Sequence, residues 1–385
     1  MSFRNRNGSR HPAQKWRDRR KTIYSADVDE ATAVIYGPLD GSETTHELLW
    51  ALTSPDTQTR LKAFDSLRHI PKSTLAQQWE ESRRVWPTGS KVFDCLERLE
   101  IEPPEIDCDR AIVTIISEGY ETLLRSMLDT LNRFGQTPEA KVIVFCVGKA
   151  FDNISDIENI TRIRCTAIER ITPAIKGALY SAARLIGARS FIMLEADMLI
   201  VHSLQPLWTL IENARPGALI GCRAQLFSEQ FTLREVLAQE NAPCTDLEFL
   251  TNRVGFDSLF WFNGGLLAGR QEAFEKLEAR FLEMMPFVSM WIEGAFEKAY
   301  ADEFACNLAA GMMESRIELS GGWNVQFYNQ ARDHWCQTEH TPSGLKFSRL
   351  GETAKILHFL APNRNLLNEV LEEINSVGIA PEGAT

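Results

Sequence analysis

Two carboxylates stand directly after a strongly apolar stretch of the chain. Residues 190–194 form a short run typical of a buried strand, and Glu195-Ala196-Asp197 follows it before apolar residues resume at Met198. Acidic side chains two residues apart after a strand can enter one cleft and offer oxygen ligands to a divalent ion. Such an ion can bridge a diphosphate and neutralise its charge as it leaves. Capping of the helix expected at 203–210, or simple solvation, is the alternative role for this pair.

The elements around this pair alternate between strand-like and helix-like patterns. Helices are expected after residue 120, with Leu124, Met127, Leu128 and Leu131 on one face, and at 173–187, which has Pro near its start and Gly at its end. Strands are expected at 111–116, 141–147, 160–168, 190–194, 218–222, 259–267 and 355–359. Apolar strands that alternate with helices predict an α/β fold with a mostly parallel sheet covered on both faces. Ligands of such sheets bind at the carboxyl ends of the strands, where Glu195 and Asp197 stand.

Three phosphate-binding motifs are not matched by this sequence. After the first strand the chain reads Ser117-Glu118-Gly119-Tyr120, which fits neither a dinucleotide-binding loop nor the glycine-rich loop of a sugar nucleotidyltransferase. The segment 264–269 has P-loop spacing, but Arg270-Gln271 replace the Lys and the Ser or Thr that the motif requires. The sequence therefore argues against these three kinds of nucleotide site.

The composition is that of a folded, enzyme-sized protein. Of 385 residues, 44% are apolar and 24% are charged, which excludes a disordered, collagenous or coiled-coil protein. The net charge of −11 argues against a nucleic-acid partner. Residues 1–21 differ, because they carry eight Lys or Arg and a single acid, Asp18. We expect a disordered basic tail at 1–25, with peripheral contact to an acidic membrane surface as its possible function.

The expected location is cytoplasmic. No stretch reaches the roughly 18 apolar residues that cross a bilayer, and the N-terminus lacks the apolar core of a signal peptide. The eight cysteines are scattered without a CxxC pair, as is typical of buried free thiols in a reducing compartment.

His334, Cys336 and His340 lie close together in the sequence and could belong to a zinc site. The sequence offers no second group of ligands at the spacing that such a site requires.

Four regions are expected along the chain. From about residue 45 to residue 100 the apolar spacing is helical, including Leu99, with breaks at prolines, until Pro103-Pro104 ends the pattern. The predicted organisation is a tail at 1–25, an N-terminal helical region at 26–107, an α/β domain at 108–364, and a C-terminal helix and tail at 365–385.

Five short motifs occur in one order between residues 111 and 364. Together they resemble the retaining glycosyltransferases of the glycogenin and bacterial lipopolysaccharide galactosyltransferase type, which have a GT-A fold. Glu195-Ala196-Asp197, within FIMLEADMLIV, is similar to their DxD motif, and FNGGLLAG at 262–269 is similar to their FNSGV strand. DEFACN at 302–307 has their DQxxxN spacing, with Glu303 in place of Gln. GWNVQ at 322–326 resembles their WN segment, and ILHF at 356–359 resembles the strand that ends in a metal-binding histidine.

This resemblance implies a metal-dependent enzyme that moves a hexose-type sugar from a UDP-sugar to an acceptor, with retention of configuration. It implies metal ligation by Glu195, Asp197 and His358, a set that suits Mn²⁺, with Mg²⁺ as the second choice. Asp302 and Glu303 would be the catalytic carboxylates near the transferred sugar. The implied donor-binding residues are Ser117, Tyr120, Lys176, Glu195, Ala196, Asn263, Gly265 and Arg364.

Besides Glu303, the chain departs from the family pattern at two further positions. Glu195 is one methylene longer than the usual Asp, and Arg364 stands where the family carries the Lys of an HxxGxxKPW segment whose Gly and Pro-Trp are absent here. Each residue also has a plain structural interpretation, such as a core histidine for His358 or a solvated helix lysine for Lys176. Other interpretations of the whole chain are a catalytically degenerate protein that binds a sugar nucleotide or a partner, and a sugar-phosphate nucleotidyltransferase. The acceptor is open among a glycan, a protein and a small molecule.

Overall fold

The computed structural model describes residues 106–167, 176–223, 262–291, 306–327 and 336–381, apart from a few single positions within these ranges. It also describes the strand β1 (Leu99–Ile101) and scattered positions between 48 and 74. The expected basic tail at 1–25 and nearly all of the expected helical region at 26–107 lie outside the described residues.

The centre of the fold is an eight-stranded mixed sheet with the order β1-β4-β3-β2-β5-β8-β7-β9. Strands β4, β3, β2 and β5 are parallel neighbours, whereas β8 runs antiparallel to both β5 and β7. The α/β class with a mostly parallel mixed sheet is thereby confirmed. Besides β1, the strands are β2 (Arg110–Ile116), β3 (Lys141–Val147), β4 (Ile160–Ala167), β5 (Ser190–Leu194), β7 (Leu219–Arg223), β8 (Phe262–Arg270) and β9 (Arg316–Leu319).

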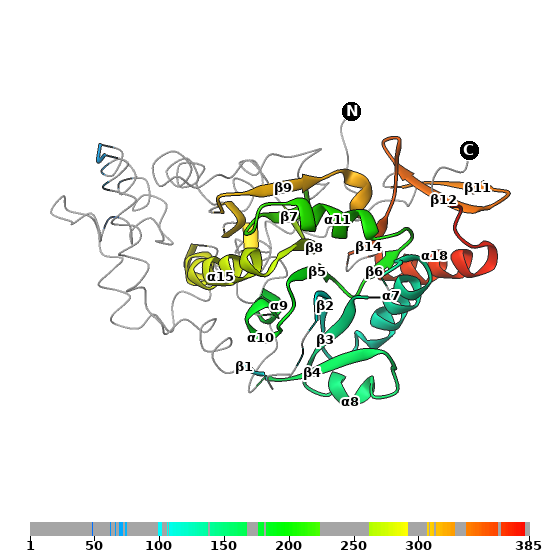
Figure 1. Ribbon diagram of the computed structural model, residues 1–385, viewed down its shortest axis with the longest axis horizontal. Helices are drawn as coiled ribbons and strands as arrows, with labels where there is room; N and C mark the ends of the chain where they lie inside the picture. The colour runs from blue at the N-terminus through cyan, green and yellow to red at the C-terminus, as the bar shows by residue number, and fades with distance from the viewer. Residues whose placement is uncertain are drawn as a thin grey trace, which may run out of the picture.

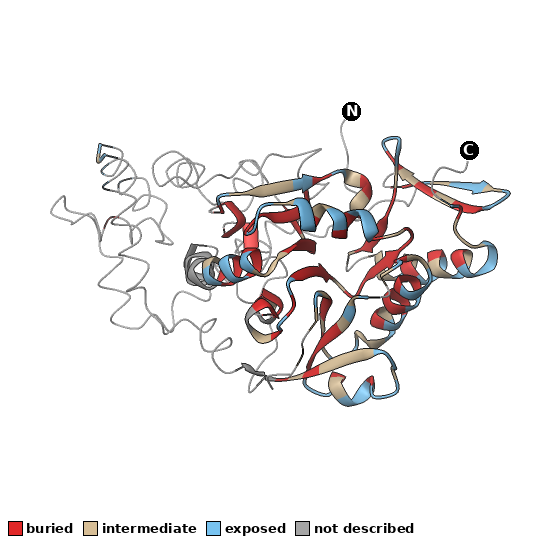
Figure 2. Cartoon of the chain, viewed as in Figure 1, coloured by how far each residue is buried: buried red, intermediate tan, exposed pale blue. Residues whose placement is uncertain are grey.

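Helices cover both faces of this sheet, as Figure 1 shows. One face carries α7 (Glu121–Phe134), α8 (Ala150–Asn153) and α11 (Gln205–Asn213), whose apolar side chains form one core cluster with those of the strands. The other face carries α9 (Gly177–Tyr180), α10 (Ala182–Leu185) and α15 (Gln271–Trp291). There Phe274 of α15 meets Phe191 of β5 with ring centroids 5.5 Å apart. Burial on both faces explains why β2, β3 and β5 are largely apolar runs, and Figure 2 shows the centre of the sheet as mostly buried.

A small three-stranded sheet, β10-β14-β6, lies beside the large one. It consists of β10 (Val325–Phe327), β14 (Ile356–Phe359) and β6 (Met198–Ile200), with β14 in the centre. Helix α18 (Arg364–Val377) buries Leu367, Val370 and Ile374 in the same apolar cluster as this sheet. A third sheet is antiparallel and consists of β11 (Gln337–Thr341), β12 (Gly344–Arg349) and β13 (Glu352–Thr353), with β12 in the centre.

One expectation about the chain before residue 106 is wrong. Leu99, which falls in a helical apolar pattern, lies in β1, where it pairs with Ala167 at the edge of the large sheet. Backbone pairing with β4 satisfies the N–H and C=O groups of this segment and overrides its helical spacing.

The six described cysteines are free, and all of them except Cys108 are buried, as the sequence predicts. Among the described helices, none combines the length and apolarity that a bilayer span requires.

Candidate functional site

Glu195, Ala196 and Asp197 form the turn that carries the chain from the large sheet into the small one, between β5 and β6. The backbone N–H of Glu195 donates a hydrogen bond of 3.0 Å to the carbonyl of Gly265 in β8. On the other side, the carbonyl of Asp197 accepts a 2.9 Å hydrogen bond from the N–H of Phe359 in β14. Both ends of the turn are thus held by neighbouring strands. The two carboxylates project from a fixed backbone, while the side chain of Ala196 joins the core cluster.

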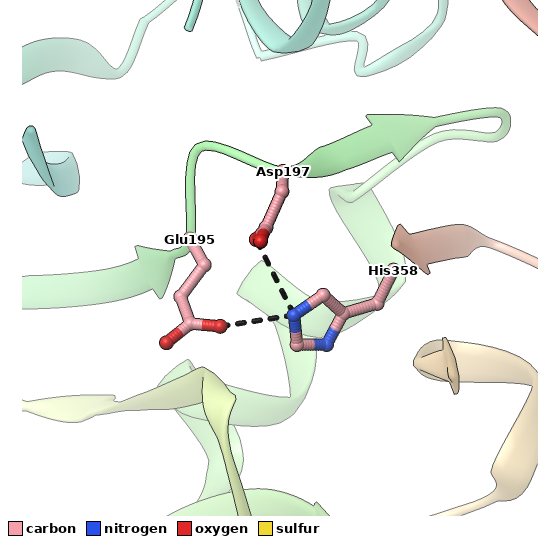
Figure 3. Close-up of side chains that lie close together, drawn as sticks. All are labelled: Glu195, Asp197 and His358. Carbon is pink, nitrogen blue, oxygen red and sulfur yellow. Dashed lines mark ion pairs between the residues drawn. The ribbon is translucent and has the colours of Figure 1, made fainter. Parts of the chain in front are cut away.

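His358 meets both carboxylates, as Figure 3 shows. Its Nε2 lies 2.9 Å from Oε2 of Glu195 and 3.4 Å from Oδ1 of Asp197. One ligand atom from each of the three residues lies within 4.8 Å of the others. The imidazole is 0% exposed, and the Asp197 side chain is 8% exposed. The structure therefore brings together the three side chains that the resemblance names as metal ligands.

The position of His358 follows from strand pairing and from one glycine. Across β14, His358 is opposite Met198 of β6 on one side and Gln326 of β10 on the other. Gly265 of β8 faces the ring, and a Cβ at that position would lie only 2.5 Å from Cε1 of His358. Only glycine permits this close approach between a strand and an imidazole.

The three side chains fit a divalent ion. Both ring nitrogens of His358 are buried and neither forms a hydrogen bond, although Nε2 is close in distance to two carboxylate oxygens. Buried polar atoms in proteins nearly always have a hydrogen-bond partner, so an imidazole in this state indicates a missing group. Two carboxylates and one imidazole around a common point form a ligand set for an ion such as Mn²⁺.

The charges within the site shift the pKa values of its members. Burial lowers the pKa of His358, but the carboxylates of Asp197 and Glu195 outweigh burial and raise that pKa to about 9. Burial likewise raises the pKa of Glu195, but Lys176 and His358 outweigh it and hold that pKa well below its usual range. The Glu195 carboxylate is therefore ionised, and a bound metal ion would displace the proton from His358.

Two basic side chains contact the same carboxylates. Lys176, immediately before α9, forms an ion pair with Oε1 of Glu195. Arg364, the first residue of α18, donates to Oδ2 of Asp197 from Nη2 at 3.1 Å and from Nε at 3.3 Å. The guanidinium of Arg364 also lies over the ring of Tyr120, 4.5 Å from its centroid. These contacts place Tyr120, Lys176 and Arg364, which the resemblance assigns to the donor, beside the candidate metal ligands.

Asn263 lies in β8, two residues before Gly265, and is almost fully buried, with 3% of its surface exposed. Its Oδ1 accepts hydrogen bonds from the N–H of Gly265 at 3.1 Å and from Nδ2 of Asn324 at 3.0 Å. Through these bonds, Asn263 fixes the backbone of β8 where Gly265 lies against His358. Ser117 follows the carboxyl end of β2, where its carbonyl accepts a 3.2 Å hydrogen bond from the N–H of Tyr120.

The segment DEFACN is described only in part, because Asp302 and Glu303 lie outside the described residues. Its last residue, Asn307, is buried and is bonded to the start of β8. The Asn307 Oδ1 accepts from the N–H of Phe262 at 2.5 Å, and its Nδ2 donates to the carbonyl of Phe262 at 2.8 Å. Asn307 therefore ties the end of this segment to the strand that carries Asn263 and Gly265.

Gln326 is a member of the site region that the sequence did not single out. It is 0% exposed, is the β10 neighbour of His358, and donates a 3.1 Å hydrogen bond from Nε2 to the carbonyl of Arg223. The signal that marks it is the alternation of Asn324 and Gln326 with apolar residues, which places two polar side chains on one face of a buried strand.

No protein-family model and no curated protein matches the sequence. Several solved structures are similar to it. The WbbM bifunctional glycosyltransferase is 12% identical over 71% of this chain and 51% of its own, with a TM-score of 0.47. The galactosyltransferase LgtC, in complex with donor and acceptor sugar analogs, is 15% identical over 71% of this chain and 98% of its own, with a TM-score of 0.42. Mouse xyloside xylosyltransferase 1 is 14% identical over 67% of this chain and 99% of its own, with a TM-score of 0.44. This chain thus spans about half the length of WbbM and nearly all of the other two.

Proposed function

We propose that this protein is a glycosyltransferase that transfers a hexose-type sugar from a UDP-sugar with the help of a divalent ion. The observation that carries the proposal is the convergence of Glu195, Asp197 and the unbonded His358 at the end of β5. This is the edge at which α/β sheets bind ligands. It is also where the motif order of the sequence implies a donor site.

The basic residues supply the second part of the proposal. A divalent ion, Mn²⁺ or Mg²⁺, held by Glu195, Asp197 and His358 would supply positive charge against the leaving diphosphate. Lys176 and Arg364 would donate charge-assisted hydrogen bonds to the same diphosphate, where negative charge develops in the transition state. Arg364 suits this task because its planar group presents several donors in a fixed geometry.

The remaining donor contacts follow the resemblance. Tyr120 and Ser117, at the carboxyl end of β2, would contact the uracil. Asn263 and Gly265 would shape the sugar pocket, with Asn263 acting through its hold on the Gly265 backbone. Asp302 and Glu303 would lie near the transferred sugar.

We favour front-face attack as the route of a retaining transfer. The bond between the anomeric carbon and the diphosphate oxygen breaks through an oxocarbenium-like state, and the acceptor oxygen bonds to that carbon on the same face. The departing diphosphate oxygen takes the acceptor proton, so no protein nucleophile is needed. Substantial activity in an Asp302→Asn, Glu303→Gln double variant would support this route, whereas double displacement requires one of these carboxylates.

We also propose where in the cell the protein acts and which acceptors should be tested. The buried free thiols agree with a cytoplasmic location, and the basic tail at 1–25 would provide peripheral contact with an acidic membrane. A glycan, a protein and a small molecule are to be tested as acceptors.

The deciding experiment is calorimetric unfolding of the full chain with Mn²⁺ and a panel of nucleotides. UDP with Mn²⁺ should stabilise the protein, by about 2.7 kcal/mol at a hundredfold excess over Kd. Asp197→Asn should abolish this stabilisation, whereas Asp156→Asn, which removes only a surface ion pair with Arg125, should retain it.

Hydrolysis of UDP-sugars separates catalysis from binding alone. A slow, metal-dependent release of UDP without acceptor would support a transferase. If no nucleotide stabilises the protein with any metal ion, the catalytic proposal fails and the degenerate, partner-binding interpretation replaces it.

A further inference from the structure

A cavity lies at the edge of the large sheet that is opposite to the candidate metal site. Its volume is about 810 Å³, and it is located where β2, β3 and β5 begin and β8 ends. Four basic and four acidic side chains line it, and none of its described lining residues is aromatic. A cavity of this size accommodates a small-molecule ligand.

Burial separates the two kinds of charge in this cavity. All four acidic side chains are exposed, namely Asp109, Glu139, Glu212 and Glu272. In contrast, Arg110 and Arg270 are partly buried, and Ser190 is only 7% exposed. The inner part of the cavity is therefore cationic and rich in hydrogen-bond donors, whereas its rim offers carboxylate acceptors.

The three inner residues form one row across three neighbouring strands. Ser190 of β5 is opposite Arg110 of β2 in a parallel pair and opposite Arg270 of β8 in an antiparallel pair. Side chains that are opposite each other in a sheet point to the same face and lie close together. This is the face that α11 covers, since the guanidinium of Arg110 lies over the ring of Trp208, 5.6 Å from its centroid. We call Arg110, Ser190 and Arg270 the arginine-serine row.

Both guanidiniums of the row contact Glu212, in the last turn of α11. Arg110 donates from Nη2 to the Glu212 carboxylate at 2.5 Å, and its Nη1 lies 3.7 Å from the highly exposed carboxylate of Glu139. Arg270 donates only to backbone carbonyls, from Nε to Ile211 at 3.2 Å and from Nη2 to Glu212. Within the described part of the chain, Arg270 forms no ion pair with a carboxylate. Two positive charges are thus close together, and only Arg110 is balanced by carboxylates.

Ser190 contributes a hydroxyl group that is not used within the protein. Its Oγ forms no hydrogen bond with any described residue, although the side chain is almost completely buried and lines the cavity. The Nη1 atoms of Arg110 and Arg270 likewise donate to none of the described residues. Buried polar groups in proteins nearly always have a hydrogen-bond partner, so these donors are suited to a ligand.

We propose that the arginine-serine row binds the phosphate group of a small phosphorylated polyhydroxy compound, such as a sugar phosphate. The phosphate oxygens accept hydrogen bonds from the hydroxyl of Ser190 and from the guanidinium on each side of it. The hydroxyl groups of the ligand donate to the exposed carboxylates of the rim. A nucleotide is a poorer fit, because the described lining offers no ring on which a base can stack.

This site is separate from the candidate metal site and does not rest on the proposed function. Ser190 is the first residue of the five-residue strand β5, and Glu195 follows the last one. At about 3.3 Å per residue, the two positions are about 17 Å apart. A phosphate on the arginine-serine row therefore needs neither a metal ion nor a nucleotide in order to bind.

The experiment is titration calorimetry of the full chain, without metal ion or nucleotide, using four probes. Glucose 6-phosphate should bind with a Kd of about 1 mM or lower. Inorganic phosphate, which lacks the hydroxyl groups of the sugar, and glucuronate, which carries a single negative charge, should both bind more weakly. Glucose, which carries no charge, should not bind.

Three substitutions test the role of each group. Arg270→Gln removes the charge but keeps a donor for the carbonyls of α11, and it should weaken binding of glucose 6-phosphate at least about tenfold. Ser190→Ala should weaken it about threefold without changing any contact to α11. Glu212→Gln removes the carboxylate that competes for Arg110 and should strengthen binding about threefold. A general disturbance of the fold would not produce this gain in affinity.

The controls are Arg125→Gln, which removes a surface arginine paired with Asp156, and Arg364→Met, which removes a base from the candidate metal site. Neither should change the affinity for glucose 6-phosphate. Circular dichroism verifies that each variant is folded. If Arg270→Gln does not fold, Ser190→Ala and Glu212→Gln decide the question.

Cys108 reports where the ligand binds. It lines the cavity and is the one described cysteine that is not buried. Glucose 6-phosphate at about ten times its Kd should slow alkylation of Cys108 about tenfold, because it occupies most of the cavities. Peptide mass spectrometry measures the rate at this residue, and glucose at the same concentration should leave it unchanged.

Four results would overturn the proposal. The first is a Kd above about 10 mM for every anion, and the second is equal alkylation of Cys108 with and without glucose 6-phosphate. The third is unchanged affinity in folded Ser190→Ala together with unchanged or weaker binding in Glu212→Gln. The fourth is loss of binding in Arg364→Met but not in Arg270→Gln, which would place the ligand at the candidate metal site. Glucuronate that binds as tightly as glucose 6-phosphate would overturn the choice of phosphate as the recognised group.

Discussion

Gly265 lies against the imidazole of His358 with no room for a side chain between them. A Cβ at position 265 would come within 2.5 Å of Cε1 of His358 and 2.6 Å of the methyl carbon of Met198. We predict that Gly265→Ala displaces the imidazole, costs about 1–3 kcal/mol of stability and weakens Mn²⁺ binding at least about tenfold. Calorimetric unfolding and Mn²⁺ titration measure both effects.

The neighbouring glycine provides the control for this prediction. A Cβ at Gly264 would meet no atom within 4 Å, so Gly264→Ala should bind Mn²⁺ like the unaltered protein. Equal Mn²⁺ binding in the two alanine variants would contradict the assignment of His358 as a ligand.

The ring of Tyr120 lies under the guanidinium of Arg364. Tyr120→Ala should weaken UDP binding at saturating Mn²⁺ by about fivefold, because the cation–π contact at 4.5 Å is lost. Tyr120→Phe keeps the ring and should remain within about twofold of the unaltered protein. UDP titration of the two variants checks this prediction, which fails if Phe and Ala have the same effect.

Asn307 holds the start of β8 with both polar atoms of its amide. Asn307→Ala should destabilise the protein by about 2–4 kcal/mol, because the buried N–H and C=O of Phe262 each lose a partner. Urea unfolding measures the change. The control is Asn153→Ala, which removes an exposed hydrogen bond to Glu121 and should cost about 1 kcal/mol or less. A loss in Asn307→Ala no larger than in this control would show that the amide does not anchor the strand.

Buried thiols make the stability of the protein fall in alkali. Burial raises the pKa of Cys146 to about 12, whereas a thiol in the unfolded chain ionises near pH 8.5. Above that pH the unfolded state binds fewer protons than the folded state, so the free energy of unfolding should fall by up to about 1.4 kcal/mol per pH unit for this thiol. Urea unfolding between pH 8 and pH 10.5 should show a shallower decline in Cys146→Ala than in Cys108→Ala, which alters a less buried thiol. Parallel declines would contradict the prediction.

Strands buried on both faces were predictable from their own residues. The segments Lys141–Val147 and Ser190–Leu194 have the predicted bounds because continuous apolar runs of this length are stable mainly as covered strands. Strands such as β11 (Gln337–Thr341) were not predicted. Its side chains are mostly exposed and polar, so the segment becomes a strand only through its pairing with β12.

The sequence by itself determined the residue types of the candidate site and their order. Its apolar runs placed Glu195 and Asp197 after β5, and its motif order led to His358 and Arg364. Only the tertiary structure decided which of these side chains contact one another, and through which carboxylate oxygen atoms they do so. The pairing of β14 with β6 sets His358 opposite Met198, the absence of a side chain at Gly265 lets β8 approach the ring, and α18 begins where Arg364 reaches Asp197. These contacts join segments distant in the chain, and their geometry depends on strand register and side-chain reach, which local sequence patterns do not encode.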